Sequence, residues 1–367
     1  MSRGLYIHIP FCKQKCNYCD FASFAGQEKY QDAYLGALTH EATLRREIAC
    51  HTLYVGGGTP SLLSVGAIHR LAKIIRHHFK AVSLFAESTF EANPESLTAE
   101  KIAVLRQLGF NRLSMGLQSF NDSELKTLGR VHSSAEFLRA YQAARDGGFA
   151  NINVDLIAGV PGQTFDSFVG SLQRLAALGP EHLSVYGLQV EEGTPFFARG
   201  VVCDQDLMRH QLEYTHDFLT QAGYHHYEIS NFAKPGKESL HNLNYWQNGE
   251  YVGLGSAAAS YQRGKRRQNT PDLHEYIFCM ENGKTPLVFS EQLTGKAQVG
   301  ETLLLALRQL DGVELTPLQA ELFGQEIEKH IQNGLLTRAH KKVKLTREGL
   351  FLANEVFRSF VAPFEDE

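Results

Sequence analysis

The stretch Cys12-Lys13-Gln14-Lys15-Cys16-Asn17-Tyr18-Cys19 carries the strongest signal in this chain. Its three cysteines lie in one short loop, directly after the apolar segment Leu5-Tyr6-Ile7-His8-Ile9, which is expected to form a strand. Three thiolates at this spacing can each bind a different iron of a four-iron four-sulfur cluster. No fourth cysteine follows in the loop, so one iron is expected to stay open to a bound molecule. The remaining cysteines are isolated in the sequence, at Cys50, Cys203 and Cys279.

Two other roles for the three cysteines agree less well with the pattern. A structural zinc ion would be bound by the thiolates together with His8, but zinc sites usually combine two well-separated pairs of ligands. Disulfides leave one of the three cysteines over, and no secretory signal precedes them. The spacing favours the cluster, and zinc stays as the alternative.

Length and composition set the class of protein. The chain has 367 residues, which suggests about two domains, or a large α/β barrel with a smaller appendage. The net charge of −4 gives no general preference for nucleic acid or an anionic membrane, and the basic runs at 265–267 and 341–344 are expected on solvated turns. The first strand starts close to Met1 and no apolar stretch is long enough to cross a membrane, so neither a signal peptide nor a transmembrane segment is expected. Free thiols and an oxygen-sensitive cluster suit a reducing cytoplasm, where we expect the protein to be located.

From residue 5 to about 230 the sequence alternates between strand and helix patterns. Helices are expected after Ser61, over 98–108, after the capping box Ser133-x-x-Glu136, and after Thr164. Strands are expected at 5–9, 52–55, 84–90, 112–118, 152–157 and 182–190. Because parallel strands need helical crossovers, these repeats predict an α/β fold whose parallel sheet curls into a partial (β/α)6, TIM-like barrel.

Unusual polar residues and glycines recur in these strands or directly after them. In barrels of this type the reactive face is formed by the C-terminal ends of the strands, so the features are expected on one rim. The glycines let the backbone approach a small molecule closely, although a tight turn without a ligand explains them equally well. The features are the cysteine loop, Gly56-Gly57-Gly58-Thr59-Pro60, Glu91-Ala92-Asn93-Pro94, Gln118-Ser119, Asp155 and Gln189.

After residue 230 the pattern changes. His241-Asn242-Leu243-Asn244-Tyr245-Trp246 leads into a small-residue strand over 251–260, against which something is expected to pack closely. From about Asp272 the chain is expected to be mostly helical, with two short helices near 317–323 and 325–333, a basic hairpin at 336–345 and a last helix from Arg347. Three units are therefore predicted: a barrel at 1–230, a flanking segment at 231–285, and a winged-helix-like domain at 286–367.

Together these motifs resemble those of radical S-adenosylmethionine (SAM) proteins. Over nearly the whole chain they are similar to the oxygen-independent coproporphyrinogen III oxidase family, and most of all to its heme-chaperone branch. The matching stretches are 6–12, 56–61, 91–94, 112–120, 155–164 and 241–246.

The resemblance implies a set of cofactor contacts. Cys12, Cys16 and Cys19 would hold the cluster while SAM chelates the fourth iron. By residue type, Glu91 would accept from the SAM amino group, Arg130 would pair with its carboxylate, and Asp155 would accept from the ribose. Tyr18 would stack on adenine, or else steady the loop as a buried aromatic. The other implied SAM contacts are Tyr6, Gly57, Gly58, Thr59 and Gln118, and Gln189 and Ala259 complete the predicted cofactor-binding residues.

His241 tests the heme reading. Imidazole is a common axial ligand of heme iron, and Tyr245 and Trp246 would lie against a porphyrin face. Most isolated histidines are structural, so this assignment depends on the match of the motif to the heme-chaperone branch.

Two departures separate the chain from the oxidases. They carry a fourth cysteine where Phe21 stands, and an N-terminal extension ahead of the first strand. Both differences match the chaperone branch, which implies a protein that binds heme and passes it to acceptor proteins, respiratory ones among them. A flavodoxin- or ferredoxin-type donor would reduce the cluster. The alternatives are a coproporphyrinogen dehydrogenase and a radical SAM enzyme acting on RNA; the charge argues against the latter, and no nucleic-acid partner is expected.

Overall fold

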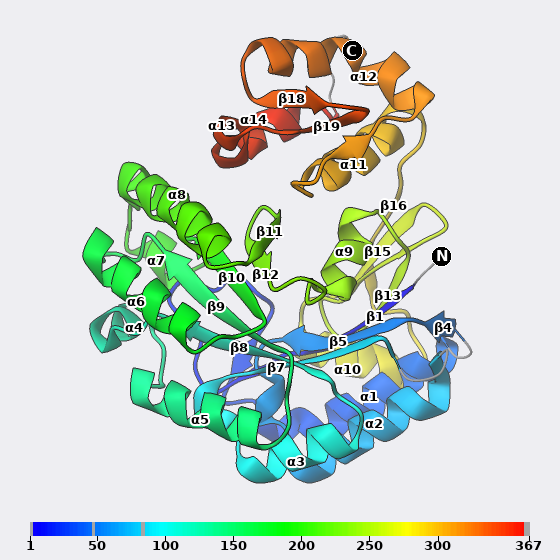
Figure 1. Cartoon of the computed structure of the whole chain (residues 1–367). Helices are drawn as coiled ribbons and strands as arrows, with labels where there is room; N and C mark the ends of the chain where they lie inside the picture. The colour runs from blue at the N-terminus through cyan, green and yellow to red at the C-terminus, as the bar shows by residue number, and fades with distance from the viewer. Residues whose placement is uncertain (1–2, 46–47, 82–84, 363–367) are drawn as a thin grey trace.

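The computed structural model describes residues 3–45, 48–81 and 85–362, and a twelve-stranded open sheet forms its centre (Figure 1). The strand order is β11-β12-β10-β9-β8-β7-β5-β1-β13-β14-β15-β16. From β13 to β10 neighbouring strands are parallel, and the strands outside that range are antiparallel. The bounds are β1 (Gly4–Ile9), β5 (Thr52–Gly57), β7 (Glu87–Ala92), β8 (Arg112–Gln118), β9 (Ile152–Ala158), β10 (His182–Gly187), β11 (His225–Glu228), β12 (Asn231–Ala233), β13 (Tyr251–Leu254), β14 (Ala259–Gln262), β15 (Lys265–Asn269) and β16 (Leu287–Gln292).

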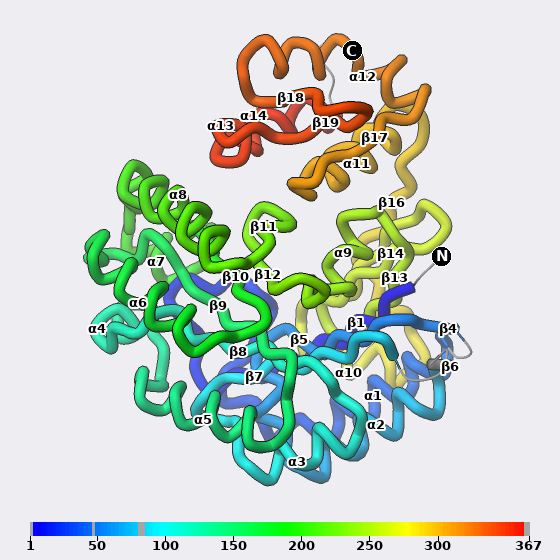
Figure 2. Tube along the Cα trace, in the orientation of Figure 1, coloured from blue at the N-terminus to red at the C-terminus, as the bar shows by residue number. Residues whose placement is uncertain are grey.

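Most helices of this part cover the outer face of the curled sheet, whereas α9 lies between the sheet and the C-terminal part (Figures 1 and 2). They are α1 (Gln31–Leu44), α2 (Val65–His78), α3 (Ala99–Gln107), α4 (Asp122–Leu128), α5 (Ser134–Asp146), α6 (Phe165–Ala177), α7 (Pro195–Ala198), α8 (Gln205–Gln221), α9 (Leu240–Trp246) and α10 (Leu273–Glu281). Short 3₁₀ turns are η1 (Glu28–Tyr30), η2 (Pro60–Leu62) and η3 (Pro94–Ser96), and two small strand pairs are β2 (Phe11–Cys12) with β3 (Phe24–Ala25) and β4 (Ile48–Cys50) with β6 (Phe79–Ala81). The predicted partial barrel is confirmed.

The strands alternate between an apolar outer face and a polar inner face, as the period of two requires. On β1, Leu5, Ile7 and Ile9 are fully buried in the core under the helices, and the residues between them turn inward. The inward positions of the other parallel strands are mostly polar. They include Tyr54, Glu91, Arg112, Ser114, Asn153, Asp155 and Ser184. The barrel interior is therefore built to hold polar groups, and it is left open at one side.

Three predicted strands differ at their ends. The third begins at Glu87, and Leu84 of the prediction lies outside the described residues. The sixth ends at Gly187, so Gln189 lies beyond it. The small-residue segment after Tyr251 is two strands with a turn between them; β13 joins the sheet beside β1 as one more parallel strand. Tyr34 packs against Gly255, where a Cβ would overlap its hydroxyl, and the backbone of Ala259 packs against Gly253.

The C-terminal part has a core of its own above the sheet (Figure 1). Its elements are α11 (Gly295–Leu307), β17 (Val313–Glu314), α12 (Pro317–Gln332), β18 (Leu336–Ala339), β19 (Lys342–Leu345), α13 (Arg347–Phe351) and α14 (Ala353–Arg358). The predicted hairpin is present as β18–β19, with β17 added at its edge.

The prediction of two short helices after residue 317 was wrong. A single helix, α12, runs through Gly324, because Phe323 and Ile327 on either side of it are buried in the same core and hold the helix continuous. In the described residues no helix is long and apolar enough to cross a membrane. The three unit boundaries stay predictions.

Candidate functional site

The cysteine loop lies at the C-terminal end of β1 and is fixed to α4. The backbone N–H of Asn17 donates to the carbonyl of Leu128 at 2.9 Å, and its side-chain amide donates to Thr127 O at 2.8 Å. Cys12 is buried, and Cys16 and Cys19 are partly exposed. Burial raises the pKa of the Cys12 and Cys19 thiols, so an electropositive ligand is needed to make them thiolates at neutral pH.

His8 is engaged elsewhere, which argues against the zinc alternative. Its Nδ1 lies 2.9 Å from the Tyr6 hydroxyl and its Nε2 lies 2.7 Å from the carbonyl oxygen of Ala22. In the described residues no three His, Cys, Asp or Glu side chains converge on a single ion. Thiols that each bind a different iron need not converge, so the loop fits a cluster better than one zinc ion.

The glycines after β5 are required by close packing. A Cβ on Gly56 would lie 2.8 Å from the Glu91 carboxyl carbon, and one on Gly58 would lie 3.0 Å from Cys12 Sγ. Gly57 has φ +114, where a side chain is strained, and its Cβ would lie 2.6 Å from the His8 ring. The three glycines therefore allow Glu91, His8 and Cys12 to pack closely against the backbone of this turn. This packing and the positive φ of Gly57 explain why glycine is present, without reference to a ligand.

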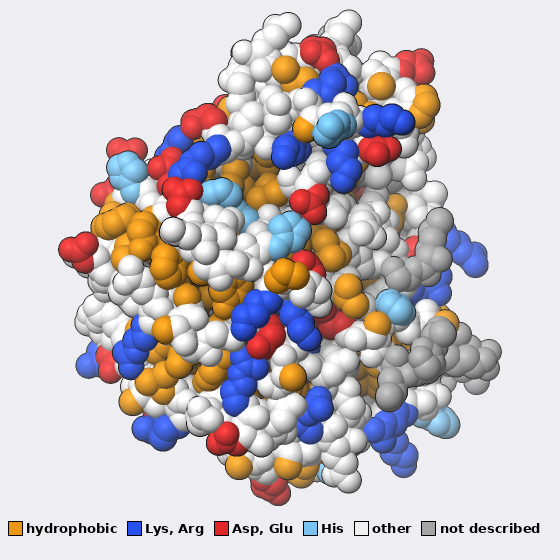
Figure 3. Space-filling model, viewed as in Figure 1, with side chains coloured by type: hydrophobic (Ala, Val, Ile, Leu, Met, Phe, Trp, Pro, Cys, Tyr) orange, Lys and Arg blue, Asp and Glu red, His pale blue; other side chains and the backbone are white. Residues whose placement is uncertain are grey.

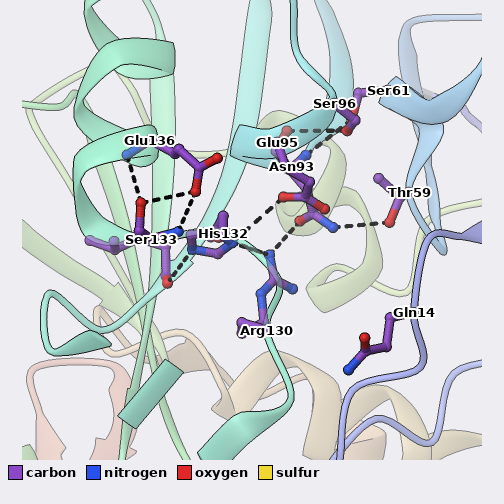
Figure 4. Close-up of polar contacts among 12 residues, drawn as sticks. Gln14, Thr59, Ser61, Asn93, Glu95, Ser96, Arg130, His132, Ser133 and Glu136 are labelled. Carbon is purple, nitrogen blue, oxygen red and sulfur yellow. Dashed lines mark hydrogen bonds and ion pairs between the residues drawn. The ribbon is translucent and has the colours of Figure 1, made fainter. Parts of the chain in front are cut away.

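Hydrogen bonds join Thr59, Asn93 and Arg130 (Figure 4), and the two ends of this series contact Cys12 and Cys16. Thr59 Oγ1 lies 3.5 Å from Cys12 Sγ and accepts from the Asn93 amide at 3.0 Å. Arg130 donates to Asn93 Oδ1 at 2.7 Å, and its other terminal nitrogen lies 3.8 Å from Cys16 Sγ. The guanidinium is therefore fixed beside the cysteine loop, as a group that pairs with a carboxylate there should be.

Behind Arg130, a buried histidine completes the support. His132 Nδ1 lies 3.4 Å from an Arg130 nitrogen and 3.6 Å from Glu95 Oε2, while its Nε2 lies 3.2 Å from Leu117 O (Figure 4). The helix after it begins with the predicted capping box, in which Ser133 and Glu136 bond reciprocally.

Glu91 is the best-defined acceptor on the rim. Its two oxygens accept from the Tyr54 hydroxyl at 2.7 Å and from the Gly57 N–H at 3.1 Å. Burial raises the pKa of Glu91 to about 7, with the nearby Asp155 carboxylate adding to the shift. A positively charged ligand amine next to Glu91 would lower this pKa and favour the ionised carboxylate.

Gln118 and Asp155 lie on neighbouring strands of the same rim. Gln118 has φ 71, in the left-handed region, at a bulge where β8 meets β9. Such strain at the end of a strand re-aims a side chain and is common at functional sites. Asp155 Oδ1 accepts from the Asn153 amide at 2.8 Å, and burial raises the pKa of its carboxyl.

A cavity of about 1600 Å³ extends from this rim along the open side of the barrel to the C-terminal part. That volume exceeds the roughly 300–1,000 Å³ of most small-molecule sites. Figure 3 shows hydrophobic surface in the furrow between the C-terminal part and the helices to its left. The predicted residues that line the cavity are Tyr18, Cys19, Glu91, Gln118, Asp155 and Gln189.

Several other predicted cofactor-binding residues do not line this cavity themselves. Tyr6 turns into the barrel and bonds to His8, and Thr59 and Arg130 lie behind the cysteine loop. Tyr18 packs against the apolar cluster around Phe196, so both roles considered for it remain compatible with its place. Ala259 does not line the cavity: it begins β14, and its carbonyl fills the space beside Gly253.

His241 lies at the opposite, N-terminal end of the strands. Its Nδ1 is 2.8 Å from Thr52 Oγ1 and its Nε2 is 2.8 Å from the Tyr245 hydroxyl, and the side chain is buried. Burial lowers the pKa of His241 to about 3, with the charge of Arg112 contributing. In this conformation the imidazole fastens α9 to the barrel and offers no free nitrogen to an iron.

Several residues of the site carried no role in the sequence analysis. Asn93 was visible within a quoted motif, but its bonds to Thr59 and Arg130 depend on chain positions 34 and 37 residues away. Tyr54 and Arg112 stood at inward positions of expected strands, and this alternation is the sequence pattern that could have identified them. No sequence pattern identified Arg308 of the C-terminal part as a site residue.

Comparison with known proteins agrees with this arrangement. The model of the Radical SAM superfamily matches residues 6–175, and that of the HemN C-terminal domain matches residues 293–352. Heme chaperone HemW of Bacillus subtilis (strain 168) is 37% identical over 98% of this chain and 99% of its own length. Heme chaperone HemW of Escherichia coli (strain K12) is 34% identical over 98% of each chain. Among solved structures, coproporphyrinogen III oxidase (HemN) from Escherichia coli matches with a TM-score of 0.86 and 27% identity, covering 98% of this chain and 90% of that one.

Proposed function

The chain belongs to the HemW family within the radical SAM superfamily, and from this we propose that it is a heme chaperone with a SAM-binding four-iron four-sulfur cluster. It binds heme and passes it to acceptor proteins, respiratory ones among them, in the cytoplasm. The observation that carries the proposal is similarity to heme chaperones over almost the full length of both chains.

The residues present fit the cluster and SAM. Cys12, Cys16 and Cys19 supply three thiols from one loop, and the Gly58 backbone lies against Cys12 with no room for a side chain. Arg130 would bind the SAM carboxylate and Glu91 the amino group, with Asp155 at the ribose and Gln118 beside them. When bound, the cluster exchanges single electrons and offers SAM an open iron. A flavodoxin- or ferredoxin-type protein would supply the electron.

The cavity supports a ligand larger than SAM. Its lining includes Tyr18 and Cys19 of the cysteine loop, the rim residues Glu91, Gln118 and Asp155, and residues of the C-terminal part, Arg308 among them. Its walls combine apolar side chains such as Leu188 and Val201 with arginines, as a flat apolar ring with acidic substituents requires.

Coproporphyrinogen oxidation is the second candidate. The observation in its favour is the match in fold to coproporphyrinogen III oxidase (HemN). Against it stands Phe21, which is 63% exposed where the oxidases have a fourth cysteine.

One experiment separates the two functions. Anaerobically reconstituted protein is mixed with heme, and separately with coproporphyrinogen, SAM and a reductant. We expect heme to bind at about one per chain with a Soret band, and no porphyrinogen turnover. Product accumulating at catalytic rates would instead establish the oxidase.

Axial ligation by His241 stays a prediction that requires α9 to move. The Nε2 atom must exchange the Tyr245 hydroxyl for iron, so Tyr245→Phe should free the nitrogen and strengthen heme binding, whereas His241→Ala should change the Soret band. If both variants lower the melting temperature and leave the Soret band unchanged, His241 acts only in packing.

A further inference from the structure

Arg308 is held unusually for an arginine on a cavity wall. It follows the last turn of α11, and its guanidinium carbon lies 4.3 Å from the centre of the Trp246 ring and 6.0 Å from that of Phe357. These aromatic faces fix the plane of the guanidinium. Trp246 belongs to α9, so Arg308 also joins the C-terminal part to the motif helix that carries His241.

The donors of this guanidinium are left without acceptors. An arginine has five N–H donors. Among residues 3–45, 48–81 and 85–362, no hydrogen bond satisfies those of Arg308, and its Nε is buried. The nearest acid is Glu228, whose Oε2 lies 3.9 Å from a terminal nitrogen and itself has no hydrogen-bond partner there. A buried Nε–H without an acceptor beside a cavity indicates a missing ligand or water.

The other arginines that line the cavity differ from Arg308 in their surroundings. The Nε of Arg112 is also buried without a partner in the described residues, but Arg112 is almost fully buried in the barrel and is not stacked on an aromatic ring of the C-terminal part. Arg209 donates to Glu213 and Glu348, and Arg112 donates to Thr89 from within the barrel. Arg145, away from the cavity, shows the fully bonded state: it lies 5.0 Å from the Tyr141 ring and donates to both oxygens of Glu181. Arg308 is likewise stacked on an aromatic ring, but it lacks the hydrogen bonds to a carboxylate that Arg145 makes.

We propose that Arg308 binds a carboxylate of the ligand that fills the cavity, and so fixes the orientation of a tetrapyrrole through one of its propionate groups. This rests on the proposed heme-binding function and adds the residue that selects for an acidic side chain. A planar guanidinium forms two parallel hydrogen bonds with a carboxylate, and stacking on Trp246 fixes its orientation in advance. The apolar ring of the ligand would then lie along the cavity, with its edge at α9.

The test compares hemin with hemin dimethyl ester, which lacks the carboxylates. Each is titrated anaerobically into the full chain, followed by Soret absorbance and by quenching of Trp246, the one tryptophan of the sequence. We expect the wild-type protein to prefer hemin by about ten- to a hundredfold, the range for a lost charge-assisted hydrogen bond. Arg308→Gln should abolish this preference, and Arg308→Lys should restore part of it.

Arg145→Gln is the matched control, because it removes a stacked, ion-paired arginine far from the cavity and should keep the preference. Equal affinity of the wild-type protein for the two ligands, or an unchanged preference in Arg308→Gln, overturns the proposal while heme binding stands. A preference lost in Arg358→Gln instead would move the anchor to α14 and overturn it too. Failure to bind either ligand overturns the heme-binding function itself.

Discussion

Replacing Asn93 by alanine should weaken SAM binding without releasing the cluster. The Asn93 amide connects Thr59, which contacts Cys12, to Arg130, which contacts Cys16. Without it Arg130 keeps its bond to the Gly116 carbonyl at 3.0 Å but loses the bond that sets its tilt. Since the three thiols themselves are unchanged, iron content should be retained.

The size of the effect follows from the bonds removed. The bond from the charged Arg130 contributes about 1.5–3 kcal/mol and the neutral bond to Thr59 about 0.5–1.5 kcal/mol, so unfolding should become easier by roughly 2–4 kcal/mol. The loss in SAM affinity has an upper limit in the complete loss of the Arg130–carboxylate pair. That limit is also about 1.5–3 kcal/mol, or roughly ten- to a hundredfold.

The assay is SAM titration of the reconstituted protein, followed by the change in the electron paramagnetic resonance spectrum of the reduced cluster. Asn111→Ala serves as the matched control. The side chain of Asn111 also makes two hydrogen bonds, accepting from Ser88 N at 2.8 Å and donating to Ala86 O at 3.2 Å, but it bonds to neither Thr59 nor Arg130. It should lower stability and leave SAM affinity unchanged.

A double variant decides whether Asn93 acts through Arg130. If it does, Asn93→Ala combined with Arg130→Ala should bind SAM no more weakly than Arg130→Ala alone, since coupled residues are not additive. Fully additive losses would refute the reasoning, and so would loss of iron from Asn93→Ala.

Three further predictions concern the same rim. Alanine at Cys12, Cys16 or Cys19 should abolish the cluster absorption and release most of the bound iron. Alanine at Cys50, Cys203 or Cys279 should leave the absorption and the iron content unchanged. Loss of iron from Cys203→Ala would contradict the ligand assignment. Burial raises the pKa of Glu91 to about 7, so the ionised carboxylate that accepts from SAM becomes scarce below that pH, and SAM affinity should fall about fivefold from pH 7 to pH 6. Glu91→Gln should bind SAM weakly and without this pH dependence, and a wild-type affinity that stays constant over this range counts against the role. Gly57→Ala should lower the free energy of unfolding by roughly 2–4 kcal/mol, measured by denaturant titration, because it combines φ +114 with overlap on the His8 ring; an unchanged midpoint would show that the turn can relax.

The sequence alone determined much of the barrel. Period-two strands, helix caps such as Ser133 with Glu136, and the cysteine loop are local patterns, and each is set by residues close together in the chain. Because parallel strands end on one edge, those patterns also placed Glu91, Gln118 and Asp155 on a common rim. The continuous α12 was missed because Gly324 interrupts the helical pattern locally, whereas buried neighbours hold the helix together.

Only the tertiary structure decided how the site is supported and where its cavity ends. His241 meets Thr52 across 189 residues, and the carboxylate of Glu87 accepts from the N–H of His241 across 154. Arg308 lies on Trp246 because the C-terminal core packs over α9, and the local sequence around either residue does not specify that contact. Periodicity reports which face of an element is buried, but it does not report which distant side chain covers that face. The reactive rim could therefore be predicted from local sequence patterns. The burial of His241 and the position of Arg308 on the cavity wall could not.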